Sequence, residues 1–106
     1  MSVADVSAVA DPNTGVSVYD SLAYRGSSGR MVFGDTSVSS PIIASVYALA
    51  GNANSVNYAS YPYSHTSSLN GVNSGSNGSC GNLLCSSTTG WDGPAGLGTS
   101  NGIGGF

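Results

Sequence analysis

Residues 36–50 read TSVSSPIIASVYALA, and this stretch decides the fold. Its apolar residues recur at the three- to four-residue spacing of an amphipathic helix. The stripe consists of Ile42, Ile43, Val46, Leu49 and Ala50. Pro41 falls in the first turn or just beyond it, where a missing N–H costs little, and Gly51 is suited to end a helix. We therefore expect one central helix over about residues 37–50, beginning at Thr36 or Ser37, with its apolar stripe buried.

Two short strands are expected before this helix. Residues 16–19 (VSVY) alternate with period two after a turn at residues 11–15 (DPNTG). Residues 30–33 (RMVF) predict the second strand, which Gly34 and Asp35 end. The stretch between them, residues 24–29 (YRGSSG), predicts a flexible turn.

Beyond Gly51 the regular pattern is lost. Residues 52–60 are compatible with another helical turn, and residues 61–65 (YPYSH) predict an aromatic loop. Long Gly/Ser/Asn-rich loops follow, and residues 90–98 (GWDGPAGLG) predict a loop that carries the one tryptophan. The expected fold class is thus α/β, a single segment over residues 1–106. Its strands and helix lie within residues 11–51, and its loops occupy residues 52–106.

The chain is unusually poor in charge. Its 106 residues include two basic and five acidic ones, so that 7% are charged, against about 25% in average proteins. The absence of a basic face excludes a phosphate-neutralising nucleic-acid binder and polybasic attachment to a membrane. No apolar run reaches the roughly 18 residues of a membrane span. A surface of Ser, Thr, Asn, Gly and Tyr is common in secreted proteins, although residues 1–10 lack the basic and apolar regions of a signal peptide.

Cys80 and Cys85 lie five positions apart in a Gly/Asn/Ser loop. In a chain of this composition, we expect them to form a local disulfide that closes the loop. A metal site with two thiolates is less favoured, because there is no second cysteine pair and His65 is distant in sequence.

Ser37 belongs to a longer pattern. Residues 34–41 (GDTSVSSP) resemble the S-G-T-S-x-x-x-P nucleophile motif of the sedolisins, or serine-carboxyl peptidases, whose fold is subtilisin-like. Residues 11–20 (DPNTGVSVYD), 41–50 (PIIASVYALA) and 90–102 (GWDGPAGLGTSNG) resemble further parts of the family's C-terminal region, in the same order. The resemblance covers about the last quarter to third of such a catalytic domain. It implies a partial subtilisin-like fold.

By this resemblance, Ser37 is the catalytic nucleophile of a secreted serine peptidase. The family's Glu and Asp partners, and the Asp that stabilises the oxyanion, belong to upstream segments, and this chain contains no Glu. A serine without a bonded base is a poor nucleophile, so we expect a fragment that is inactive alone. Two alternatives remain. One is a non-catalytic structural or binding module derived from such a peptidase that self-associates; the other is a minimal esterase using Ser37 and His65.

The resemblance also implies a calcium loop near the C-terminal end. Its ligands would be the carboxylate of Asp92 and the backbone carbonyls of Val72, Thr88 and Gly90. Gly71 stands where the family has a second carboxylate, and Asp35 stands where the nucleophile motif usually has Gly. Calcium gains affinity with the number of carboxylates, so we expect weak binding or none.

The expected partners follow from the short strands and the apolar stripe. Without a partner, the two strands would present open sheet edges, and the helix would present an uncovered apolar face. We expect the missing N-terminal part of the catalytic domain, or a second copy, to cover them. A peptide substrate is expected only for the completed enzyme.

Overall fold

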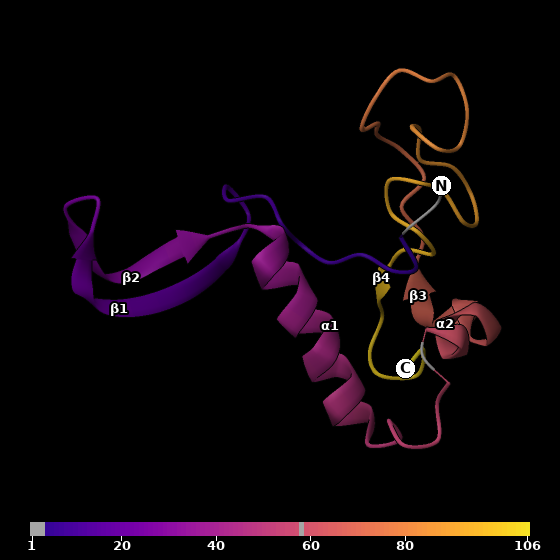
Figure 1. The fold of residues 1–106 in the computed structure, drawn as a ribbon, viewed down its shortest axis with the longest axis horizontal. Helices are drawn as coiled ribbons and strands as arrows, with labels where there is room; N and C mark the ends of the chain where they lie inside the picture. Colours follow the sequence, from indigo (N-terminus) through magenta and orange to yellow (C-terminus); the bar gives the residue numbers. More distant parts are fainter. Residues whose placement is uncertain (1–3, 58) are drawn as a thin grey trace. The chain divides into compact units, whose positions relative to one another are not determined.

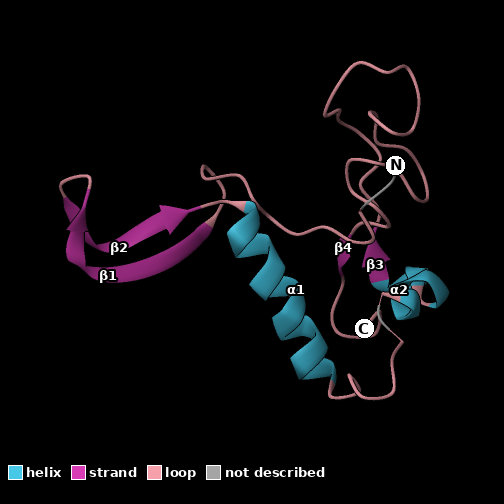
Figure 2. Cartoon of the chain, in the orientation of Figure 1, coloured by secondary structure: helices cyan, strands magenta, loops and turns pink. Residues whose placement is uncertain are grey.

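The computed structural model describes residues 4–57 and 59–106, which form a small mixed α/β structure with two short antiparallel sheets and one main helix (Figure 1, Figure 2). The elements, in chain order, are β1 (Val16–Tyr24), β2 (Ser27–Phe33), α1 (Thr36–Ala50), α2 (Ser60–Ser64), η1 (Thr66–Ser68), β3 (Leu69–Asn70) and β4 (Thr99–Ser100). The chain divides into two compact units. We call Val9–Ile42 the hairpin unit, and Met1–Ala8 together with Ile43–Phe106 the loop unit.

Strands β1 and β2 form an antiparallel hairpin that is longer than expected. The register pairs Val16 with Phe33 and Asp20 with Gly29, and it shifts between Asp20 and Tyr24. Arg25 and Gly26 make the turn with positive φ values of 51° and 81°, as a two-residue turn of the I′ type requires. The flexible turn predicted over residues 24–29 is therefore wrong apart from these two residues. Of the residues added to β1, 21–24 are all exposed, and the register is irregular there.

Helix α1 confirms the prediction of a helix over about residues 37–50. The carbonyl of Asp35 accepts the first helical hydrogen bonds, from the N–H of Val38 (2.9 Å) and of Ser39 (3.3 Å). Gly51 ends the helix with a φ of 73°. The expected burial of the apolar stripe is not met within this chain, because no residue of α1 is buried and Leu49 is 74% exposed.

The loop unit has a small core. Among the described residues, the buried apolar side chains are those of Leu69, Ala95, Phe106 and Pro62. The ring of Phe106 is 1% exposed and meets Tyr47 edge-on, with centroids 5.0 Å apart. Strands β3 and β4 pair antiparallel beside it. The C-terminal residue thus anchors the unit.

The predicted aromatic loop over residues 61–65 is largely the short helix α2. Pro62 lies in its first turn, where no N–H is required, and its carbonyl accepts the N–H of His65 (3.1 Å). The rings of Tyr61 and His65 stack with centroids 3.8 Å apart. No helix in the described part of the chain is both long and apolar enough to cross a membrane.

Candidate functional site

Ser37 lies exposed in the first turn of α1, directly after the hairpin. Gly34 permits this connection: a Cβ at this position would collide with the backbone of Asp11 and Pro12. The turn that begins at Asp11 is closed by a bond from the N–H of Thr14 to the Asp11 carbonyl (3.2 Å). The predicted turn and the predicted nucleophile segment are therefore in backbone contact.

Asp35 binds Ser37 through two hydrogen bonds that sequence analysis missed. Its Oδ1 accepts the backbone N–H of Ser37 (2.8 Å) and the Ser37 hydroxyl (3.0 Å), and the Thr36 hydroxyl lies 3.3 Å away. The bond from the Ser37 N–H, followed by those from the two hydroxyls, lowers the pKa of Asp35 below its ordinary value. A carboxylate with a lowered pKa is a weak base, so it accepts the hydrogen bond from the serine hydroxyl without readily removing the proton. An aspartate two positions before a serine at a helix start is a typical capping signal.

His65 has different surroundings from Ser37. It lies in the loop unit, whereas Ser37 lies in the hairpin unit. The Nδ1 atom of His65 is 2.9 Å from the Tyr61 carbonyl, and its ring stacks on Tyr61. These contacts account for the orientation of His65, which directly follows α2.

Asp92 is the most deeply buried polar residue of the described chain, with 0% exposure. Its Oδ2 accepts the N–H of Thr88 and its Oδ1 accepts the N–H of Ala95, each at 2.9 Å. Two backbone bonds with Gly96 close the turn around the carboxylate. Of the four predicted calcium ligands, Thr88 and Asp92 are therefore brought together by a direct hydrogen bond.

The other predicted calcium ligands are backbone carbonyls, so Asp92 is the one charged ligand of the predicted set. Val72 is half-buried, and Gly90 is exposed with a φ of 88°. Gly71 has open space: a Cβ there would have one neighbour within 4 Å, the Asn73 Oδ1 at 3.9 Å. Across residues 4–57 and 59–106, no three His, Cys, Asp or Glu side chains gather into a group that could hold a metal ion. Asp92 supplies the one carboxylate of the predicted set, and both of its oxygens accept N–H groups.

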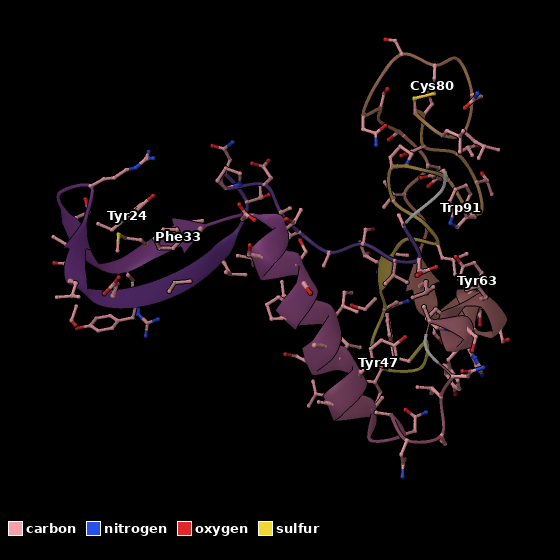
Figure 3. All side chains as sticks on the ribbon, viewed as in Figure 1. Tyr24, Phe33, Tyr47, Tyr63, Cys80 and Trp91 are labelled. Atoms are coloured by element: carbon pink, nitrogen blue, oxygen red, sulfur yellow. A yellow bond between two sulfur atoms is a disulfide. The ribbon has the colours of Figure 1, made fainter. Side chains whose placement is uncertain are left out.

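The predicted disulfide between Cys80 and Cys85 is present, with the sulfurs 2.04 Å apart (Figure 3). Its loop is attached to the Asp92 turn, because the N–H of Gly93 donates to the carbonyl of Leu83 (2.7 Å). A Cβ at Gly93 would collide with the Leu84 backbone, so the glycine allows this close approach. The disulfide loop and the Asp92 turn form one connected structure.

Tyr63 and Trp91 hold the N-terminal segment, residues 4–8, in the loop unit (Figure 3). The Trp91 indole N–H donates to the Ala4 carbonyl, and the Tyr63 hydroxyl donates to Asp5 Oδ1, both at 2.8 Å. The bond to Asp5, then burial and the Asp5 charge, raise the pKa of Tyr63. No local sequence pattern could have revealed these contacts, because the partners are 58 and 87 positions apart.

Comparisons with protein-family models, with curated proteins and with solved structures found no match to this chain. They supply neither a family nor a structural neighbour. A function must therefore be inferred from the residues themselves, their spacing and the contacts that they make.

Proposed function

We propose that this chain carries the nucleophile segment of a secreted, sedolisin-like serine peptidase with a subtilisin-like fold, and that it does not cleave peptides on its own. The observation that carries the proposal is the placement of Ser37, whose hydroxyl lies exposed in the first turn of α1 after a hairpin strand. A nucleophile needs this access to a substrate carbonyl. The disulfide and the low charge content support secretion.

The surroundings of Ser37 support inactivity. Its hydroxyl donates to Asp35, whose pKa is lowered by the hydrogen bonds that it accepts. A general base works best when its pKa lies near the working pH, so Asp35 is poorly suited to activate the hydroxyl. Removing a member of a catalytic set typically costs orders of magnitude in rate.

A second candidate function is a non-catalytic binding module that self-associates. The exposed Leu49 in the stripe of α1 favours it, because this side chain would gain roughly 1.5–3 kcal/mol from complete burial. Both candidates require a partner surface for α1. They differ in whether Ser37 becomes reactive after that surface is supplied.

Reactivity of Ser37 can be tested directly. The chain is incubated with a fluorophosphonate probe, and peptide cleavage is measured at acidic pH, with Ser37→Ala as the matched control. We expect neither labelling of Ser37 nor cleavage. Labelling or cleavage that Ser37→Ala abolishes would overturn the proposed inactivity and would support an esterase or a complete peptidase.

The proposed ancestry can be tested without any activity. We propose that the Asp92 loop binds calcium weakly at best, because Gly71 lacks the carboxylate that the resemblance expects. There is room for a side chain at Gly71, so Gly71→Asp should raise the calcium affinity about tenfold or more, measured by isothermal titration. Ser74→Asp adds the same charge three residues away and serves as the control. Equal affinities in the two variants would contradict the proposed calcium loop.

A further inference from the structure

Residues 4–8 bind to the C-terminal part of the loop unit through hydrogen bonds and one isolated bridge. The N–H of Leu97 donates to the Asp5 carbonyl (2.8 Å), and the N–H of Ser7 donates to the Gly98 carbonyl (2.9 Å). Ser7 and Thr99 form a parallel bridge. Because β4 pairs with β3 through Thr99 and Ser100, the segment extends that small sheet.

Side chains of the loop unit recognise the segment in addition to the backbone. Trp91 binds the Ala4 carbonyl and Tyr63 binds the Asp5 carboxylate. Gly96 permits close approach, since a Cβ at this position would collide with the Asp5 carbonyl. A peptide that adds a strand gains affinity from main-chain bonds and specificity from such side-chain contacts. Trp91 and Tyr63 therefore hold Ala4 and Asp5 of the chain's own segment through one main-chain and one side-chain oxygen.

Along the chain, residues 4–8 are connected to the rest of the loop unit through the hairpin unit. Residues 9–42 form the hairpin unit, and the chain returns to the loop unit at Ile43, within α1. Every hydrogen bond described for residues 4–8 lies within the loop unit. These bonds would be the same if the segment came from another copy, which is the condition for exchange of an element between protomers.

We propose that residues 4–8 are exchanged between two copies of this chain, so that each copy's segment docks beside β4 of the other. The exchanged dimer keeps the hydrogen bonds of Ala4, Asp5 and Ser7 described above and differs from the closed monomer in connectivity. A tethered segment has an effective concentration in the millimolar range, so the closed monomer dominates at micromolar concentration. Exchange becomes substantial at millimolar concentration, or when two samples are refolded together. This association does not involve Ser37, so it stands independently of the proposed peptidase ancestry.

The bridge between Ser7 and Thr99 allows the exchange to be trapped. Neighbouring strands lie about 4.8 Å apart, within the range that a disulfide spans. A tagged Ser7→Cys chain and an untagged Thr99→Cys chain are refolded together at millimolar concentration and oxidised gently. New disulfides are identified by mass spectrometry, which separates them from the native Cys80–Cys85 bond. A mixture of Thr14→Cys with Thr99→Cys measures random cross-linking, because Thr14 is exposed in the hairpin unit.

We expect several-fold more cross-linked heterodimer from the Ser7→Cys mixture than from the control mixture, falling as the protein is diluted. The double variant Ser7→Cys/Thr99→Cys should form an intramolecular bond at micromolar concentration, which shows that the segment docks as described. The proposal is overturned if the double variant closes but the mixed single variants cross-link no more than the control. It is equally overturned if the double variant does not close, since the docking site itself would then be wrong.

Discussion

Asp35 and Asp92 are both bonded to backbone N–H groups, but one is exposed and the other is fully buried. Asp35 caps a helix and also takes the hydroxyl of Ser37. Asp92 organises a turn by accepting the main-chain N–H groups of Thr88 and Ala95. The sequence could suggest both residues from their motifs. The resemblance gave no reason to expect a bond between Asp35 and Ser37, because the motif usually has a glycine at position 35; the capping signal of an aspartate at a helix start was the available indication.

The cap at Asp35 should depend on pH. Its pKa is lowered in the folded chain, so its stabilising contribution is present above the ordinary pKa of an aspartate and is lost as the pH falls through the folded value. The protection factor of the Ser37 amide, which corrects for the intrinsic pH dependence of hydrogen exchange, should therefore fall at strongly acidic pH. Asp35→Ala should lower this protection factor at neutral pH, whereas Asp35→Asn should make it independent of pH and retain the cap. Equal protection of the Ser37 amide in wild type and Asp35→Ala would contradict this role.

Asp92 should be important for the stability of the loop unit. In Asp92→Asn, one of the two backbone donors would face an NH2 group in a fully buried position. An unsatisfied buried donor costs about 1–3 kcal/mol, so urea unfolding should show a loss of that size. Asp11→Asn is the control, since Asp11 is exposed and an asparagine can still accept the Asn13 N–H. Similar midpoints for both variants would show that the buried carboxylate is dispensable.

At the scale of elements, the helix and the disulfide could be predicted from the sequence, but the full hairpin and α2 could not. Helix α1 has a periodic apolar pattern and a C-terminal glycine, which are local signals. Past residue 20 the hairpin continues through exposed residues and an irregular register that resumes at Tyr24 and Ser27, so burial leaves no periodic pattern there. α2 has only five residues and includes a proline, so propensity argued against it.

The disulfide should stabilise the loop that it closes. Replacing both cysteines, Cys80→Ser/Cys85→Ser, should cost about 2 kcal/mol on the chain-entropy model for so short a loop. Amide protection at Gly93 should also fall, because its N–H bonds to Leu83 inside the loop. Intact mass should rise by two hydrogens on reduction. Unchanged protection at Gly93 after reduction would show that the Asp92 turn does not depend on the disulfide.

For the whole molecule, the apolar stripe of α1 predicts association. Leu49→Ser removes an exposed leucine, while Ala48→Ser changes the neighbouring exposed position outside the stripe. If the stripe is buried against a second copy, Leu49→Ser should weaken self-association about tenfold or more, as measured by light scattering over a concentration series. Ala48→Ser should have little effect. Identical association of both variants with wild type would exclude the stripe as the interface.

The contacts between segments far apart in the sequence could not be predicted from local sequence patterns. The pairing of Ser7 with Thr99, and the bonds from Tyr63 and Trp91, join segments that share no repeat, charge complementarity or periodicity. The predicted nucleophile and the predicted calcium loop fall in different compact units. Local motifs therefore located the residues of interest, but they could not predict which segments would be held together.

The hairpin turn has a consequence for limited proteolysis. Trypsin can cut this chain only after Arg25 and Arg30, because it contains no lysine, and both arginines are exposed in the hairpin. Arg25 lies at the tip with a positive φ, so it should be nicked first. The N-terminal fragment would still carry residues 4–8, which the loop unit holds by hydrogen bonds, and β1, which pairs with β2 of the other fragment. A nicked protein should therefore run as one species on a native gel and as two fragments in denaturant.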